Sequence, residues 1–232
     1  MKIGIMQPTF VPWAGYFGLI NYVDKFVFLN DVQFDSRSWQ QRNKIYNNNT
    51  TAWLTIPVVK KKLQNQKIFD VKIDFSSNFK KKHIKTIHHN YAKAKYFKKY
   101  IAFFEELYSK QFEYLSEMNI YFIKEICNLI DINAEFFTSK DLDVDGKKSE
   151  RLINICNKLK VKKYISVEGS KDYLQADAGL FLKKKINIIY FGYNELEYNT
   201  FYSNFFPKLS IIDIIFNCGE NSKKIIVGGI ND

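Results

Sequence analysis

Short apolar runs and longer amphipathic stretches alternate along this chain. Residues 2–7 and 26–29 are apolar runs of strand length, and residues 17–25 between them have the length of a short helix. Two strands joined by one helix in so short a span predict a parallel strand–helix–strand unit with a right-handed crossover. The chain is therefore expected to open as an α/β fold.

The hydrophobic pattern changes period in the middle of the chain. Residues 53–57 and 69–73 are further strand candidates, each preceded by a turn-prone or polar stretch. From residue 78 to residue 131, apolar and aromatic side chains recur every three or four positions, as at Leu115 and Met118. This spacing is typical of amphipathic helices. We expect residues 78–131 to form a helical insert or subdomain.

The last part of the chain returns to alternating strands and helices. The expected strands are residues 134–137, 163–166 and 186–191, and the expected helices are residues 149–159, 173–184 and 210–217. Gly219 follows the last helix, where glycine is a common C-terminal cap, and the tail beyond it is expected to be loose. The pattern contains no repeat or low-complexity linker, so it predicts one compact domain over residues 1–232 with a mostly parallel sheet.

Composition is that of a globular protein. The chain is 46% hydrophobic and 17% aromatic, and no apolar run approaches the roughly 20 residues that cross a bilayer. The N-terminus lacks the pattern of a signal peptide, so we expect a cytoplasmic protein without a transmembrane segment. The three cysteines are widely spaced and the three histidines lack partners at ligand spacing. Neither a disulfide framework nor a metal site is expected.

Positive charge is spread widely over the chain. The net charge is +11, with lysine runs at residues 60–62, 80–82 and 183–185. Such a field attracts nucleic acids and other anions. No nucleic-acid recognition motif accompanies the lysines, and the Lys-, Asn- and Ile-rich composition resembles the drift of an AT-rich coding genome. A nucleic-acid partner is therefore not expected, whereas a nucleotide-linked substrate remains compatible with the charge.

Arginine is rare and concentrated. The 35 basic residues include only Arg37, Arg42 and Arg151, and the first two lie close together in a polar segment. A planar guanidinium grips a carboxylate or phosphate at two points, which lysine does not do. The pair therefore predicts a bound oxyanion. The alternative is an ordinary surface ion pair with a nearby aspartate.

Polar side chains follow the first two predicted strands. Gln7 ends the first apolar run, and Asp31 and Gln33 follow the second. Open α/β folds bind ligands at the carboxyl ends of parallel strands. We therefore expect Gln7, Asp31 and Gln33 to surround one cleft together with Arg37 and Arg42. A purely structural hydrogen-bond network is the alternative.

Motifs along nearly the whole chain carry a family resemblance. In order they are MQPTF (6–10), PW (12–13), GYF (15–17), DVQF (31–34), RSWQ (37–40), RN (42–43), KKSERL (147–152), GSKDYL (169–174) and PKLSIID (207–213). This set resembles the WbqC-like family, which implies an association with bacterial O-antigen and other surface-polysaccharide clusters. The chain departs from the usual pattern at Val167-Glu168 before the glycine. We place Trp39, Arg42 and Asn43 among the expected substrate-binding residues.

A second, more distant likeness concerns the first strand-to-helix turn. The order strand, turn, helix, strand and then Asn30-Asp31 is similar to the start of pantothenate synthetase and related nucleotidyltransferases, which bind ATP at that turn. The likeness implies a Rossmann-like sheet. Trp13 and Tyr16 stand where those enzymes carry two histidines, so the usual stabilisation of the reacting phosphate is missing. Both are expected to bind substrate, Trp13 by stacking, unless they only cap the core.

The glycine motif after the strand at residues 163–166 is a third candidate. Parallel strands deliver their following loops to one edge of the sheet. Lys171, Asp172 and Tyr173 are therefore expected at the same cleft, with Lys171 neutralising a phosphate. The alternative is a plain turn in which Asp172 caps the next helix.

Three functions fit this sequence. The first is transfer of an acyl or aminoacyl group to the amine of a nucleotide-linked sugar, with Asp31, Gln7 and His83 as the expected catalytic residues. The second is nucleotidyl transfer, and the third is non-catalytic binding of a sugar nucleotide. The cofactor is left open between ATP and an acyl carrier, as is assembly into a homo-oligomer.

Overall fold

A computed structural model describes residues 1–59 and 65–231, so the whole lysine run at 60–62 lies outside the described residues. Five parallel strands form the central sheet: β1 (Lys2–Met6), β2 (Lys25–Phe28), β5 (Glu135–Thr138), β6 (Lys163–Val167) and β7 (Asn187–Tyr193). Their spatial order is β5-β2-β1-β6-β7, with β8 (Ile230–Asn231) antiparallel at the β7 edge. The first parallel strand is thus central and the chain winds outward in both directions, as in a Rossmann-like sheet. The predicted fold class is confirmed.

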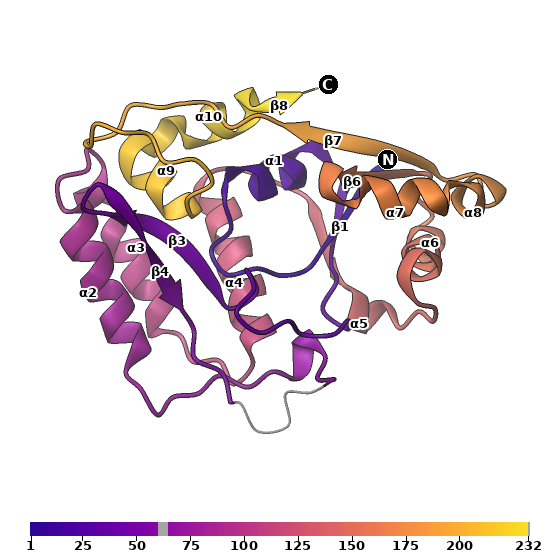
Figure 1. Cartoon of the computed structure of the whole chain (residues 1–232), viewed down its shortest axis with the longest axis horizontal. Coiled ribbons are helices and arrows are strands. Elements are labelled where there is room, and N and C mark those ends of the chain that lie inside the picture. The colour runs from indigo at the N-terminus through magenta and orange to yellow at the C-terminus, as the bar shows by residue number, and fades with distance from the viewer. Residues whose placement is uncertain (60–64, 232) are drawn as a thin grey trace.

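The helices that connect the parallel strands pack close to the sheet (Figure 1). They are α1 (Ala14–Tyr22), α5 (Ser139–Leu142), α6 (Lys148–Lys158), α7 (Lys171–Ala176) and α8 (Ala178–Lys183). The single helix expected over residues 173–184 is wrong, because the helix is interrupted at Asp177.

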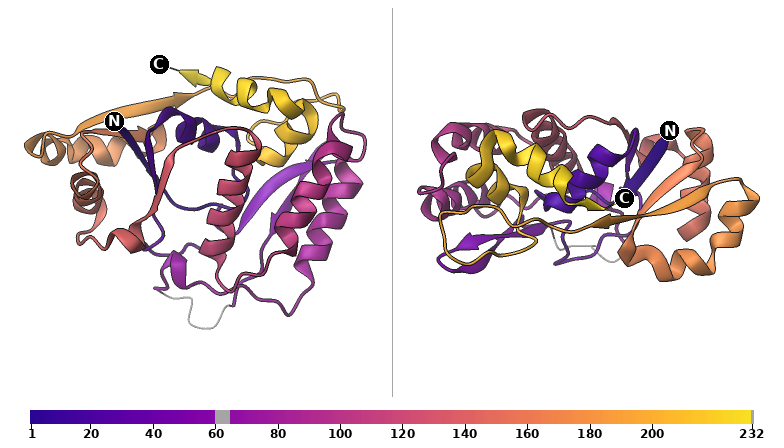
Figure 2. Two further views of the ribbon diagram at one scale, coloured as in Figure 1. Left: turned by 180° about the vertical axis from the view of Figure 1, so that it is seen from behind. Right: turned by 90° about the horizontal axis from the view of Figure 1, so that it is seen from above.

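The C-terminal tail is ordered rather than loose. It forms a 3-10 turn (Gly219–Asn221), α10 (Ser222–Gly228) and β8, and α10 contacts α1 (Figure 2). Ile226 of α10 is fully buried, and α1 is buried at every residue from Ala14 to Ile20. A helix that is apolar all round needs cover on both sides, which explains why the tail folds back.

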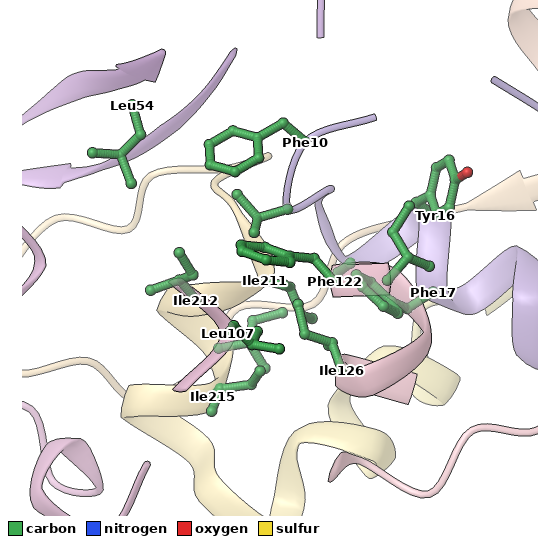
Figure 3. Packing of buried hydrophobic residues seen from close by; sticks show 14 of the residues in the cluster. Phe10, Tyr16, Phe17, Leu54, Leu107, Phe122, Ile126, Ile211, Ile212 and Ile215 are labelled. Atoms are coloured by element: carbon green, nitrogen blue, oxygen red, sulfur yellow. The ribbon is translucent and has the colours of Figure 1, made fainter. Parts of the chain in front are cut away.

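The expected helical insert consists of α2 (Phe79–Tyr91), α3 (Phe97–Ser109) and α4 (Leu115–Leu129). These helices share a core with α9 (Ile211–Cys218) and with the loop after β1. Figure 3 shows Phe10 of that loop beside Phe122 of α4 and Ile211 of α9. The same cluster of buried residues extends to Phe26 of β2, so hydrophobic contacts are continuous between the insert and the sheet.

A two-stranded ribbon precedes the helices and is separate from the sheet. It consists of β3 (Arg42–Asn47) and β4 (Thr50–Thr55), paired antiparallel. Asn48 and Asn49 form its turn with φ of 45° and 60°, as a two-residue hairpin turn requires. The strand expected at residues 69–73 is wrong, since that region holds a 3-10 turn (Ile68–Asp70) and only isolated bridges.

Candidate functional site

The direction of winding reverses between β1 and β6, and a cavity of about 320 Å³ opens there. Met6 and Gln7 line it at the end of β1, and Ser166 and Val167 line it at the end of β6. Loops leaving two neighbouring strands in opposite directions create a crevice at this point, where open α/β sheets bind their ligands.

Two further cavities adjoin this one. The cavity on the β2 side, of about 340 Å³, shares Leu29, Leu152 and Tyr173 with it and adds Lys148 and Arg151. The cavity on the α1 side, of about 250 Å³, shares Met6 and Val167 and adds Trp13, Tyr16, Glu168, Tyr193 and Lys208. We call the three together the crevice. Both flanks carry cations, while the centre carries uncharged polar groups.

Buried amides hold the loop after β1 in place. Asn43 donates to the carbonyls of Phe10 (3.1 Å) and Val11 (2.8 Å), and Asn119 donates to the carbonyl of Pro8 (3.3 Å). Val11 has φ of 33°, a conformation that a β-branched side chain strongly disfavours. The surrounding hydrogen bonds maintain this strained backbone, and such strain gathers at functional sites. Asn43 is therefore a buried supporting residue.

Gln7 is oriented by its neighbours. Its side-chain Oε1 accepts a hydrogen bond from Nε2 of the buried Gln40 at 2.9 Å, and its backbone carbonyl accepts one from the Tyr16 hydroxyl at 3.0 Å. Both Gln7 and Gln40 line the central cavity. The amide of Gln7 is thus held in one orientation at the end of β1.

Trp13 folds over the start of α1. A Cβ at Gly15 would lie 2.5 Å from the Trp13 ring, so only glycine permits this contact. The ring also meets Tyr193 edge-on with centroids 5.3 Å apart, and the Lys208 ammonium lies 5.8 Å from its centroid. Trp13 and Tyr16 both line the α1 side of the crevice.

Asp31 forms a buried ion pair with Arg151. The Arg151 Nε donates to one carboxylate oxygen at 3.2 Å and Nη2 donates to the other, while Ser139 Oγ donates to the first at 2.6 Å. The side chains of Asp31 and Arg151 are 6% and 18% exposed. Because both carboxylate oxygens are engaged, Asp31 fixes the guanidinium at the edge of the crevice.

His83 lies in the core. Its Nε2 is 3.1 Å from the Thr55 carbonyl and its Nδ1 is 3.0 Å from the Tyr108 hydroxyl. The carbonyl can only accept, so Nε2 carries the proton and Nδ1 accepts from Tyr108. Burial lowers the pKa of His83 from 6.5 to about 4. His83 is not among the described residues that line the crevice.

The arginine-bearing segment lies mainly on the outside. Arg37 is exposed with φ of 63°, and Gln33 is exposed and bridges to Lys67. Arg42 begins β3 and stacks on Trp53, while Trp39 lines the central cavity. Of the cleft expected to join Gln7, Asp31, Gln33, Arg37 and Arg42, the structure brings Gln7 and the Asp31–Arg151 pair to the crevice. Asp31 reaches the crevice only through Arg151, and Asp31, Gln33, Arg37 and Arg42 are themselves not among the described lining residues.

The loop after β6 is open. Tyr173 is 47% exposed and lines two of the three cavities. Lys171 and Asp172 are exposed in the first turn of α7, and the Lys171 ammonium lies 5.7 Å from the Tyr190 ring centroid. Neither is among the described lining residues, so Tyr173 is the member of this predicted group that borders the crevice.

Sequence reasoning missed several crevice residues, among them Arg151, Lys148, Ser166, Glu168 and Lys208. Arg151 could have been found from the rarity of arginine, which drew attention only to Arg37 and Arg42. Lys148 and Ser166 carry no such signal, because lysine is abundant and Ser166 lies inside an apolar strand.

Clusters of metal-ligating residues and membrane-spanning helices are both absent from the described part of the chain. Within residues 1–59 and 65–231, no group of at least three His, Cys, Asp or Glu residues could hold a metal ion. No helix among them is long and apolar enough to cross a bilayer.

Fold and crevice together define an α/β protein with a crevice at the switch point of a Rossmann-like sheet. The chain belongs to the WbqC-like protein family, whose profile matches residues 7–225. It is 31% identical over 223 residues to the uncharacterized protein Rv1507c of Mycobacterium tuberculosis, covering 95% of each chain. No solved structure gives a significant match. Family membership indicates a protein associated with polysaccharide clusters.

Proposed function

We propose that the crevice binds a nucleotide-linked amino sugar and that the protein transfers an acyl or aminoacyl group to the sugar's amine. The observation that carries this proposal is the row of three adjoining cavities at the β1/β6 switch point. Sheets of this order hold nucleotide ligands across that point. The polysaccharide context of the family supports a sugar as the second part of the ligand.

The charges at the two flanks suit a diphosphate linkage. Arg151 is held in place by Asp31, and Lys148 borders the same cavity. A guanidinium that is already fixed loses less conformational entropy when a ligand binds than a free lysine side chain does. On the opposite flank, Trp13 and Lys208 offer an aromatic face and a cation for the nucleoside or the acyl donor.

The reaction requires the amine nitrogen to attack the acyl carbonyl carbon while the bond to the carrier breaks. The proton lost from the nitrogen passes to a base, and the carrier leaves as a thiolate that takes up a proton. Glu168 lines the crevice and has no ion-pair partner among the described residues, so we assign this role to Glu168 and the orienting of Arg151 to Asp31. We assign to the Gln7 amide nitrogen a hydrogen bond to the acyl carbonyl oxygen, because the Gln7 Oε1 already accepts from Gln40.

Direct transfer is favoured over a thioester on the protein. Cys127, Cys156 and Cys218 are all buried, and burial raises the pKa of each thiol to about 12. A thiol with so high a pKa supplies little thiolate at neutral pH.

The test is to incubate the protein with a nucleoside-diphosphate amino sugar and an acyl or aminoacyl thioester, and to follow N-acylation by mass spectrometry. The matched control sugar nucleotide carries a hydroxyl in place of the amine. Acylation of the amino sugar alone supports the proposal. Binding without acylation indicates a sugar-nucleotide-binding protein, pyrophosphate release from a nucleoside triphosphate indicates nucleotidyl transfer, and absence of binding overturns the proposal.

Variants separate the parts of this site. Glu168→Gln should abolish acylation while sugar-nucleotide binding is kept, because only the proton acceptor is removed. Lys171→Met tests whether this exposed lysine reaches the bound phosphates, with the exposed Lys183→Met at the end of α8 as its matched control. Equal binding by these two lysine variants would exclude Lys171 from the site.

A further inference from the structure

The outer face of the β3–β4 hairpin carries an unusual surface. Trp53 is 41% exposed and Trp39 is 48% exposed, and their ring centroids lie 5.3 Å apart at an interplanar angle of 45°. Tryptophan is rarely left in water without a partner, and adjoining exposed aromatic rings mark binding surfaces. We call Trp39, Trp53, Arg42 and Lys44 the hairpin platform.

Cations are fixed on this platform. The Arg42 guanidinium carbon lies 4.2 Å from the Trp53 ring centroid and the Lys44 ammonium lies 5.2 Å from it. Register explains this arrangement, because Lys44 pairs with Trp53 and Arg42 pairs with Thr55, so these side chains share one face of the ribbon. Stacking on an indole holds a guanidinium in place while leaving its edge free for an anion.

The Arg42 head group has unused hydrogen-bonding capacity. Its Nε is buried and has no hydrogen-bond partner, and Arg42 and Lys44 are in no ion pair within residues 1–59 and 65–231. The charges of both side chains are therefore unpaired within the described residues, which leaves them available to a bound anion.

The platform is continuous with the crevice. Trp39 lines the central cavity beside Gln7 and Gln40, and its carbonyl accepts a hydrogen bond from the Phe10 backbone at 2.9 Å. A ligand in the crevice that extends past Trp39 therefore meets Trp53 and the two cations.

We propose that the hairpin platform binds an acidic saccharide, whose pyranose ring stacks on the open indole face of Trp39 while its carboxylate pairs with Arg42 and Lys44. The axial C–H groups of a pyranose pack on an aromatic face, and the charge complementarity selects an anionic sugar over a neutral one. This inference extends the proposed function by adding an acidic glycan unit to the ligand, yet the platform can be tested without any transfer reaction.

The test measures binding of a uronic-acid oligosaccharide by tryptophan fluorescence and calorimetry, with the neutral oligosaccharide of the same length as the control ligand. Native protein should bind the acidic ligand at least about tenfold more tightly, and raising ionic strength from about 0.01 M to about 0.15 M should weaken that binding. Equal affinity for both ligands, or no binding of either, overturns the proposal.

Variants locate the binding. Trp39→Ala, Trp53→Ala and Arg42→Gln should each weaken acidic-saccharide binding by about tenfold. Phe75→Ala is the matched control, because Phe75 is also 48% exposed but is not part of the platform. Trp39 lies in a loop, so its variant tests the proposal even if Trp53→Ala disturbs the ribbon. Unchanged affinity in Trp39→Ala and Arg42→Gln contradicts it, whereas failure of acylation alone bears only on the transfer reaction.

Discussion

The two loops that form the crevice differ in how firmly they are held. After β1, Phe10 and Val11 are fully buried and the backbone is fixed by Asn43 and Asn119. After β6, a Cβ at Gly169 would meet nothing within 4 Å, and α7 begins without a side-chain cap. We call the loop after β1 the first wall, or β1 wall, and the loop after β6 the second wall, or β6 wall. The first wall is ordered before any ligand binds, whereas the second wall has few contacts that would oppose a rearrangement.

The difference assigns separate tasks to the two walls. A preorganised wall contributes orientation, because its order is established on folding and not on binding. An open wall contributes access, since residues with few buried contacts lie at the low-stability end of a protein. Of these two loops, only the one after β1 contains a non-glycine residue with positive φ, Val11, which costs on the order of 1–3 kcal/mol.

The largest effect is expected from the histidine beneath the first wall. His83 packs against Phe10 with ring centroids 5.9 Å apart, and burial lowers its pKa from 6.5 to about 4. The unfolded chain takes up this proton at higher pH than the folded chain. Stability is therefore complete above pH about 6.5 and falls with decreasing pH, and the loss reaches about 3 kcal/mol below pH about 4.

Urea unfolding across this pH range measures the effect as the difference between native protein and His83→Gln, which does not titrate. The exposed His89→Gln on the same helix is the control and should parallel the native protein. A difference between native protein and His83→Gln that stays constant with pH would contradict a neutral buried histidine.

The sequence was sufficient for the parallel sheet and for most of the longer helices, but not for the break at Asp177, for α10 or for the hairpin. Apolar runs mark all five parallel strands, because β1, β2 and β6 are largely buried and β5 and β7 are covered in part. β3 was not predicted because a polar residue, Asn43, occupies one of its buried positions. Asn43 can be buried there because it donates a hydrogen bond to the loop after β1, which is distant in sequence.

The site was predictable only where it follows strand ends. Gln7, Trp13 and Tyr173 border the crevice because topology brings those loops together. The pairing of Asp31 with Arg151 could not be inferred, since the two are separated by most of the chain and meet only through the order β5-β2-β1-β6. Arg37 and Arg42 were placed in the predicted cleft because they lie close to Asp31 and Gln33 in the sequence.

A second prediction weakens the first wall directly. Asn43→Ala removes both donors to the carbonyls of Phe10 and Val11, and Phe10 then keeps a buried acceptor without a partner. We expect a loss of about 2 kcal/mol in the free energy of unfolding. The exposed Asn187→Ala at the start of β7 is the control, with an expected change within about 0.5 kcal/mol.

Chemical denaturation gives both values, and calorimetry on the folded variant gives the sugar-nucleotide affinity. Because the β1 wall orients the ligand, Asn43→Ala should bind more weakly even at a temperature where it is fully folded. Native affinity in the folded variant would show that the wall does not need its fixed backbone for binding.

The smallest effect is expected in the second wall. Gly169 lacks a positive φ and has open space around its Cβ position, so Gly169→Ala should stabilise the protein by about 0.4–1 kcal/mol through lower entropy of the unfolded chain. Gly219→Ala is the contrasting variant, because Gly219 has φ of 55° and its added Cβ would lie 2.6 Å from the Tyr96 ring. That variant should lose stability by more than Gly169→Ala gains. If the open β6 wall rearranges on binding, Gly169→Ala should also slow sugar-nucleotide association in stopped-flow measurements, since alanine restricts the backbone. An unchanged association rate together with the expected gain in stability would mean that the β6 wall binds its ligand without moving.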